Sequence, residues 1–236
     1  MATGLELLAG EITSCTQCPR LVEWRERVAR EKRRMYRDQD YWGRPVPGFG
    51  DPAARILILG LAPGAHGANR TGRMFTGDRS GDFLYRTLHA VGLASQPESV
   101  GRDDGVFLHD AFISAACRCV PPDNKPLPEE IRNCRGWLER ELALLRRIRV
   151  VVALGRIAFD DYLTLLRDRG NLRSRSGFAF AHGRVHDPGP GASKLISSYH
   201  PSQQNTQTGK LTFPMFQEVF VEAIRLANPR DETAVL

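Results

Sequence analysis

Four of the five cysteines in this chain have the chemistry to hold one metal centre. Cys15 and Cys18 form a C-x2-C pair, and Cys119 and Cys134 lie far downstream. Four thiolates suit either a tetrahedral zinc site or an iron–sulfur cluster, and their spacing does not choose between the two. Cys117 could take the place of Cys119, and ordinary buried or free thiols are the alternative to any metal site.

A glycine-rich loop carries the next set of candidate residues. Residues 60–78 read GLAPGAHGANRTGRMFTGD, directly after an apolar run. The glycines let the backbone approach a ligand closely, with N–H groups free to bind oxygen atoms. The pattern is neither a Walker A loop nor a dinucleotide-binding GxGxxG motif. Phe75 could stack on a planar base or pack in the core, and Asp78 could act chemically or cap the following helix.

A histidine after the last apolar run is the remaining side chain suited to chemistry. His200 stands at the expected end of a strand and begins the polar run HPSQQNT. A single histidine is more often structural, but one in this position is well placed to donate a hydrogen bond into a crevice.

Strands and helices alternate along the rest of the chain. Continuous apolar runs predict strands at 55–60, 111–116, 149–154 and 194–199. Apolar residues at helical spacing predict helices at 81–92, 128–147, 155–167 and 212–227. Glycine and proline mark 38–53 as an irregular connector, and 168–193 as a hairpin or loop.

This alternation predicts an α/β fold with a doubly wound parallel sheet. Ligands of such folds bind in the crevice beyond the carboxyl ends of the strands. Here that crevice would be formed by loops 61–80, 117–127 and 200–211, which include most of the glycine-rich loop and His200.

The composition suits one compact domain that could bind a polyanion. The chain has 236 residues, 42% of them apolar, and a formal net charge of +6. Basic residues are concentrated at positions 20–37, which favours either a solvated helix face or a phosphate-binding surface. The longest apolar run, Ile56–Ala62, is too short to span a bilayer and no signal peptide is visible, so we expect a soluble intracellular protein. The odd number of cysteines argues against a disulfide framework.

Taken together, the two loops resemble those of the uracil-DNA glycosylase superfamily. Gly60–Gly64 (GLAPG) is similar to the first motif of that family, and His200–Ser202 (HPS) to the second. The whole glycine-rich loop and the run HPSQQNTQTGKLT resemble the iron–sulfur branch found in prokaryotes, specifically its type B, or family 5. The resemblance extends from Cys15 to about residue 225.

The resemblance implies a three-layer α/β/α fold with a central four-stranded, parallel, twisted sheet in a single domain, 1–236. Residues 1–53 would form an N-terminal helical extension, 54–228 the α/β core and 229–236 a tail. The resemblance also implies a structural [4Fe-4S] cluster that ties the extension to the core and leaves Cys117 as a spare thiol. The ligands of the cluster would be Cys15, Cys18, Cys119 and Cys134.

The activity that the resemblance implies is removal of uracil and other deaminated bases, such as hypoxanthine and xanthine, from DNA by base flipping. Other branches place a polar or acidic residue where this chain has Leu61 and Ala62, and an asparagine where it has the segment 113–115. We therefore expect relaxed base selectivity, and Asp78 becomes the best candidate to orient the attacking water. His200 would donate a hydrogen bond to the departing base.

The same mechanism assigns further contacts. Phe75 would stack on the flipped base, and Gln203 and Gln204 could fill the space that the base leaves. The other residues expected at the base are Gly60, Leu61, Ala62, Gly64 and Asn124. The residues expected to contact DNA are Asn69, Ser202, Gln203 and Asn205.

The expected partner is DNA containing uracil or another deaminated base, bound by a monomer in the prokaryotic cytoplasm and not at a membrane. The leading alternative is a non-catalytic iron–sulfur or zinc protein that binds DNA without cutting it. Asp78 argues against this alternative, because a carboxylate repels phosphates. A nucleotide hydrolase on the same sheet is a second alternative, but it needs several carboxylates at the strand ends, where the chain offers Asp78 and Asp123.

Overall fold

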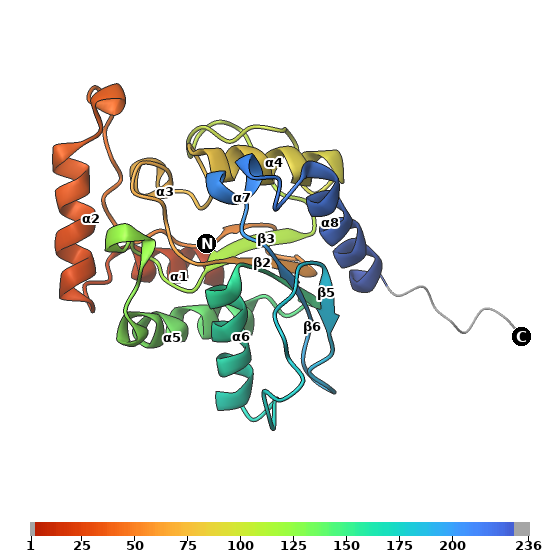
Figure 1. Cartoon of the computed structure of the whole chain (residues 1–236). Helices are drawn as coiled ribbons and strands as arrows, with labels where there is room; N and C mark the ends of the chain where they lie inside the picture. The colour runs from red at the N-terminus through yellow and green to blue at the C-terminus, as the bar shows by residue number, and fades with distance from the viewer. Residues whose placement is uncertain (1–2, 229–236) are drawn as a thin grey trace, which may run out of the picture.

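A central block of four parallel strands organises the fold, which the computed structural model describes for residues 3–228 (Figure 1). In spatial order the strands are β3 (Ala111–Ala115), β2 (Ile56–Gly60), β4 (Val150–Leu154) and β6 (Lys194–Ser198). Each lies within one of the four apolar runs, and β2, β3 and β4 are buried at every position. Such continuous burial is typical of parallel strands that are covered on both faces. The predicted parallel core is therefore confirmed.

The prediction of a sheet with only four strands is wrong, because two short edge strands extend it to six. Strand β1 (Phe49–Gly50) pairs antiparallel with β3, and β5 (Arg184–His186) pairs antiparallel with β6. The full order is β1-β3-β2-β4-β6-β5, and the sheet is mixed. Strands of two and three residues are too short to show an alternating pattern, so the sequence does not reveal them. Strand β1 also places the end of the N-terminal extension in the sheet.

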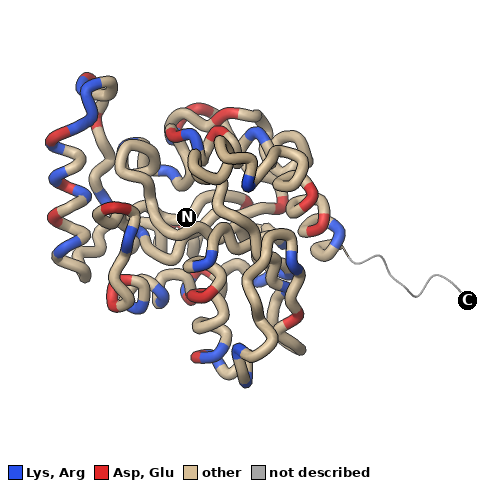
Figure 2. The backbone as a smooth tube through the Cα atoms, viewed as in Figure 1, with Lys and Arg blue, Asp and Glu red and all other residues tan. Residues whose placement is uncertain are grey.

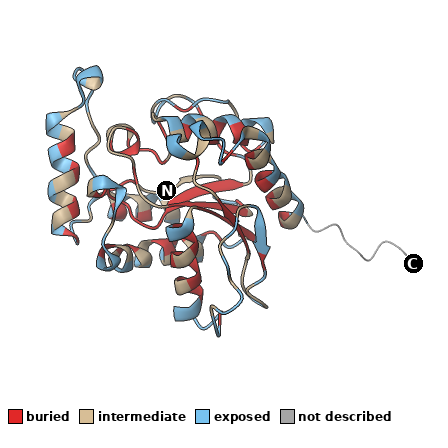
Figure 3. Ribbon diagram, viewed as in Figure 1, coloured by how far each residue is buried: buried red, intermediate tan, exposed pale blue. Residues whose placement is uncertain are grey.

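Helices cover both faces of the sheet, as the three-layer prediction requires (Figure 1). On one face α4 (Arg79–Ala90) and α8 (Phe213–Ala227) share a core with Ile56 and Ile58 of β2. On the other face α5 (Pro128–Leu144) and α6 (Arg156–Asp168) share a core with Leu57 and Leu59 of the same strand. Alternate residues of one strand thus serve two cores. Figure 3 shows the buried strands between helices whose outer sides are exposed.

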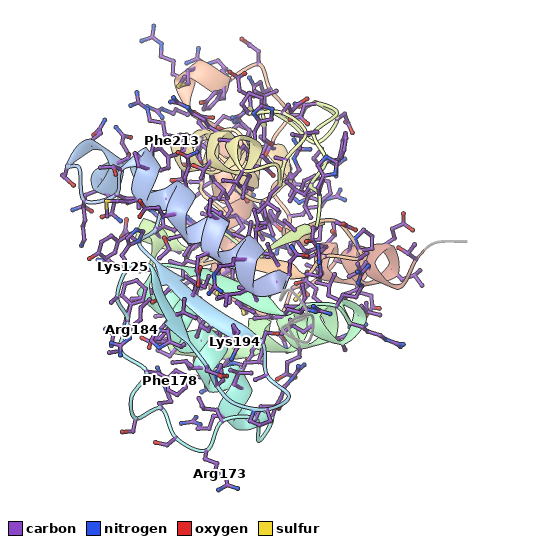
Figure 4. The ribbon with its side chains drawn as sticks, turned by 90° about the vertical axis from the view of Figure 1, so that its right-hand side faces the viewer. Lys125, Arg173, Phe178, Arg184, Lys194 and Phe213 are labelled. Carbon is purple, nitrogen blue, oxygen red and sulfur yellow. The ribbon has the colours of Figure 1, made fainter. Side chains whose placement is uncertain are left out.

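The view in Figure 4 looks onto the β6 side of the molecule, with α8 lying across the sheet and Phe213 at the start of that helix. The segment between α6 and β5 extends to the opposite end of the view, where Arg173 marks its tip. The predicted hairpin or loop at 168–193 is thus a long irregular segment that contains β5.

Two N-terminal helices are joined to α5 by ion pairs. Helix α1 (Gly4–Thr13) packs against α5, and Glu11 pairs with Arg140 at 2.7 Å. Helix α2 (Pro19–Glu31) begins with a proline in its first turn, directly after a C-x2-C cysteine. Its Arg20 donates two hydrogen bonds, of 2.8 and 2.7 Å, to Glu130 near the start of α5. The 3-10 turn η1 (Arg34–Tyr36) then follows α2.

Three loops meet at the carboxyl ends of the parallel strands. The loop after β2 contains α3 (Ala68–Thr71), the loop after β3 contains η2 (Pro122–Asn124), and the loop after β6 contains α7 (Gln203–Gln207). These are the loops that the sequence selects for the ligand site. The tail at 229–236 lies outside the described residues, among which no helix combines the length and apolar character needed to cross a membrane.

Candidate active site and cysteine cavity

A cavity of about 790 Å³ opens at the carboxyl ends of the parallel strands. All three predicted loops contribute to its walls. The predicted base- and DNA-contacting residues that line it are Leu61, Ala62, Gly64, Asn124, Ser202 and Gln203. Phe75, Asp78 and His200 line the same cavity. The two predicted catalytic groups therefore face one space, together with the aromatic ring expected to hold a base.

Asp78 both caps a helix and faces the cavity. It is the N-cap residue of α4, and its Oδ1 accepts a hydrogen bond from the backbone N–H of Gly81 at 3.0 Å. Its Oδ2 lies against Gly64 and Gly67, where a Cβ at Gly67 would overlap that oxygen. Burial raises the pKa of this carboxyl above its usual value, although the α4 backbone N–H groups oppose the change. One oxygen is thus anchored, and the other is left for a ligand or water.

Phe75 is shared between the core and the cavity. Its backbone has a φ of 52°, an uncommon conformation for a bulky residue. Its ring rests on Gly60, where an added Cβ would lie 2.8 Å from Phe75 Cε2. Gly60 is therefore needed beneath the ring and does not itself line the cavity. On the cavity side, the ring centroids of Phe75 and His200 are 5.8 Å apart.

His200 is held in a neutral form by its surroundings. The protein atoms packed around its ring lower its pKa from 6.5 to about 4. The side chain of Asn205 donates a hydrogen bond to the backbone carbonyl of His200 at 2.8 Å. Ser202 caps α7, and its Oγ accepts a hydrogen bond from the Asn205 N–H at 3.3 Å. Asn205, predicted to contact DNA, here fixes the shape of the histidine loop.

The predicted DNA contact of Asn69 is wrong. This side chain is fully buried, and its Nδ2 donates a hydrogen bond to the backbone carbonyl of Arg25 at 3.2 Å. It joins α3 to α2, inside the protein. Its place in a polar loop suggested exposure, because the sequence does not show that α2 packs over this loop.

Arg70, which no sequence pattern singles out, holds the glycine-rich loop together. Its Nε donates to the carbonyl of His66 and its Nη2 to the carbonyl of Gly77, both at 2.8 Å. These two bonds fix the backbone on either side of the loop, next to Asp78. No sequence pattern marks an arginine that binds backbone carbonyls in this way. The glycines opposite Asp78, in contrast, indicate a loop whose backbone a ligand can approach closely.

A second, small cavity is lined by the four predicted metal ligands, Cys15, Cys18, Cys119 and Cys134. Cys117 does not line it. Instead, Cys117 is fully buried, and a hydrogen bond with the Cys134 sulfur raises its pKa. Cys119, and not Cys117, therefore lines the cavity with the other three cysteines.

The chemistry around this cavity fits an anionic cluster. Arg25 Nη1 donates a hydrogen bond to Cys119 Sγ at 3.1 Å. Buried N–H groups of Arg25 and Arg118, which both line the cavity, have no protein acceptor among the described residues. Such orphan donors are costly unless a ligand satisfies them.

A site for a single metal ion was also sought among all the described side chains. No three His, Cys, Asp or Glu side chains within residues 3–228 are grouped to hold one. A tetrahedral zinc site needs its sulfurs about 3.8 Å apart, from Zn–S bonds of about 2.3 Å.

Comparison with known proteins identifies the family. The model of the uracil DNA glycosylase superfamily matches residues 47–224. This range includes all the residues that line the larger cavity except Arg33, Met35 and Tyr36. The chain belongs to the uracil-DNA glycosylase superfamily. Within that superfamily it is 56% identical to a type-5 uracil-DNA glycosylase of Thermus thermophilus over 223 residues, 94% of this chain and 98% of the relative.

Other relatives agree with this assignment. A type-5 uracil-DNA glycosylase of Mycobacterium tuberculosis is 52% identical over 92% of this chain and 80% of its own length. A type-4 uracil-DNA glycosylase of Archaeoglobus fulgidus is 31% identical over 66% of this chain and 70% of its own length. The resemblance inferred from the two loops, including the family-5 branch, is confirmed.

The wall of the cavity directly after β2 is apolar, as the sequence predicts. Leu61 and Ala62 line the cavity next to Gly64. Ser114, in the segment that lacks the asparagine of other branches, is fully buried and donates its hydroxyl to Glu141 on α5 at 2.7 Å. The side chains of Leu61 and Ala62, which line the cavity directly after β2, therefore cannot activate water.

Proposed function

We propose that this protein is a uracil-DNA glycosylase, which hydrolyses the N-glycosidic bond of uracil in DNA and leaves an abasic site. The observation that carries the proposal is the meeting of Asp78, Phe75 and His200 on the walls of one cavity. Membership of the superfamily and the printed names of the type-5 relatives support it. All three side chains come from one chain, which supports action as a monomer.

Base flipping follows from the enclosed position of these groups. A base inside a duplex cannot reach a cavity at the ends of β2 and β6, so the nucleotide must leave the stack, at a cost of a few kcal/mol. Stacking on Phe75 would recover about 1–3 kcal/mol of this cost. The backbone of the glycine-rich loop and the histidine loop would hold the flanking phosphates.

In the chemical step, Asp78 Oδ2 orients a water whose oxygen bonds to C1′ of the sugar. The C1′–N bond breaks, and its electron pair leaves with the base. The proton lost by the water passes to Asp78, whose raised pKa suits a general base, and the base anion takes a proton from solvent. Neutral His200 donates a hydrogen bond to the base oxygen where negative charge develops.

The broad base selectivity is a second part of the proposal. Leu61 and Ala62 present no polar group that could distinguish one base edge from another. Discrimination is strong only where buried polar groups would be left unpaired by the wrong substrate. We therefore propose that hypoxanthine and xanthine are accepted as well as uracil.

A [4Fe-4S] cluster is the third part, held by Cys15, Cys18, Cys119 and Cys134. When bound, it would supply structural cross-links and no step of the hydrolysis. Its ligands lie before α2, after β3 and within α5, so it would tie the N-terminal helices to the core. The unsatisfied N–H groups of Arg25 and Arg118 support an anionic occupant.

The test of function is release of the base from an oligonucleotide with a single uracil, read as strand breakage after alkali treatment. We expect breakage at uracil, hypoxanthine and xanthine, and none in a matched oligonucleotide with thymine. Tight binding without breakage at any of these bases would instead identify a non-catalytic DNA-binding protein. Breakage at uracil alone would retain the activity and reject the broad selectivity.

A further inference from the structure

A short N-terminal segment forms part of the wall of the candidate active site, although it lies outside the region that the superfamily model matches. Residues 32–41, here called the arm, follow α2 and contain η1, which lies above α2 in Figure 1. Lys32, with a φ of 50°, ends the helix and turns the chain into the arm. Three arm residues line the active-site cavity: Arg33, Met35 and Tyr36.

The arm is attached to the loop that carries Asp78. The Arg70 guanidinium stacks on the Tyr36 ring, 4.0 Å from its centroid, and its Nη1 donates to Gln39 Oε1 at 2.6 Å. The same guanidinium donates to the carbonyls of His66 and Gly77. One side chain therefore joins the arm to both sides of the glycine-rich loop.

A second attachment lies at the far end of the arm. The Tyr41 hydroxyl is 3.0 Å from His66 Nδ1, and it accepts a hydrogen bond from the Arg33 N–H at 3.3 Å. The backbone N–H of Trp42, the next residue, donates to the carbonyl of Arg70 at 2.9 Å. The arm is thus held at a fixed place relative to the catalytic carboxylate.

The exposed surface of the arm combines positive charge with one large apolar side chain. Residues 32–41 contain four basic side chains, Lys32, Arg33, Arg34 and Arg37, and two acidic ones, Asp38 and Asp40, and Figure 2 shows basic residues at the upper end of α2. Among the described residues, Lys32 is the one basic member of this group with a carboxylate within 4 Å, that of Asp40. Met35 is 64% exposed in the midst of these charges.

We propose that the arm is a DNA-binding element that grips the duplex beside the flipped nucleotide, with Met35 packed against the bases next to the gap. The inference rests on the proposed glycosylase function. Arginines without carboxylate partners match the phosphate backbone, and methionine is among the apolar side chains that proteins insert between base steps. The arm continues the wall of the cavity that would receive the base, so DNA bound there must pass over it.

The test compares uracil release from a duplex and from a single strand of the same sequence, under single-turnover conditions. Met35→Ala should lower the duplex rate about tenfold and the single-strand rate by less, because flipping a nucleotide out of a duplex breaks a base pair as well as a stack. Met35→Leu should restore the duplex rate. The matched control is Leu7→Ala on α1, where the side chain is 61% exposed and lies outside the cavity.

The charge of the arm has its own readout in the salt dependence of duplex binding. Arg33→Gln with Arg34→Gln should reduce the slope of log affinity against log salt by about 0.9 for each lost phosphate contact. Arg173→Gln is the control, because this exposed arginine lies at the tip of a distant segment (Figure 4).

An unchanged ratio of duplex to single-strand rates in Met35→Ala would overturn the inference, and so would an equal loss on both substrates. A salt slope equal to that of the wild type in the double arginine variant would also overturn it. The glycosylase function would survive any of these results. Wild-type protein that releases uracil from neither substrate would overturn both proposals.

Discussion

Asp78 divides its two oxygens between structure and chemistry. Oδ1 satisfies a backbone N–H at the start of α4, while Oδ2 faces the cavity against two glycines. From the sequence alone, the cap and the catalytic role of Asp78 are alternatives, because a sequence shows which residue precedes a helix but not where its second oxygen points. The cap is present at this residue, and the second oxygen stays available for the proposed chemistry.

The space opposite Asp78 gives the first prediction at the residue scale. Gly67→Ala places a methyl group on Oδ2, so the carboxylate must move, and a misplacement of about 1 Å can cost a hundredfold in rate. We expect about that loss in single-turnover uracil release, and about 1–3 kcal/mol less unfolding free energy from overpacking. Gly101→Ala, with nothing within 4 Å of the added carbon, should change neither. Wild-type activity in Gly67→Ala would show that Oδ2 has room to spare.

The neutrality of His200 predicts the shape of the pH–rate profile. With a pKa of about 4, the imidazole stays neutral through the range where an ordinary histidine titrates near 6.5. The single-turnover rate should therefore show no inflection that belongs to His200 near pH 6.5, and the loss of rate in acidic solution should come from protonation of Asp78, whose pKa is raised. An inflection near pH 6.5 that disappears in His200→Gln would contradict this role for His200.

At the scale of elements, the long apolar segments were predictable and the short ones were not. The strands at 56–60 and 150–154 stand out because they are buried on both faces. Strands β1 and β5 form because they pair with β3 and β6. A local sequence pattern does not show such pairing. The burial of Asn69 likewise depends on α2, which packs over a loop distant from it in the sequence.

The cysteine cavity supplies the prediction at this scale. Cys119→Ala should remove most of the iron from purified protein, because Cys119 lines the cavity between α2 and α5. Cys117→Ala, a change to an equally buried thiol two residues away, should leave the iron in place. Iron content per chain and visible absorption measure both. Equal iron loss in the two variants would contradict the assignment of Cys119, and not Cys117, as the ligand.

At the scale of the whole molecule, the active site should make stability depend on pH. The folded pKa of His200, about 4, lies below the unfolded value of 6.5, so the unfolded chain binds more protons between these values. Stability must then fall as pH is lowered through this window. From pH 7 to pH 5 we expect a loss of about 1–2 kcal/mol that is absent in His200→Gln. Urea unfolding at both pH values measures it, and identical pH dependence in the two proteins would contradict it.

The role of the N-terminal segment was the least predictable feature of the molecule. The basic residues at 20–37 were compatible with a solvated helix face or a phosphate-binding surface. The structure divides them between α2 and the arm, and only the arm reaches the cavity. This division depends on contacts to Arg70 and His66, which lie in a different part of the chain.

Asp78→Asn tests the central claim most directly. Asparagine is as good an N-cap as aspartate, so α4 should keep its start and the fold its stability. Single-turnover release of uracil from a duplex should fall by about 100- to 10,000-fold, because the water loses its general base, while duplex binding stays near that of the wild type. Full activity in this variant would remove Asp78 from the mechanism and contradict the account of the site.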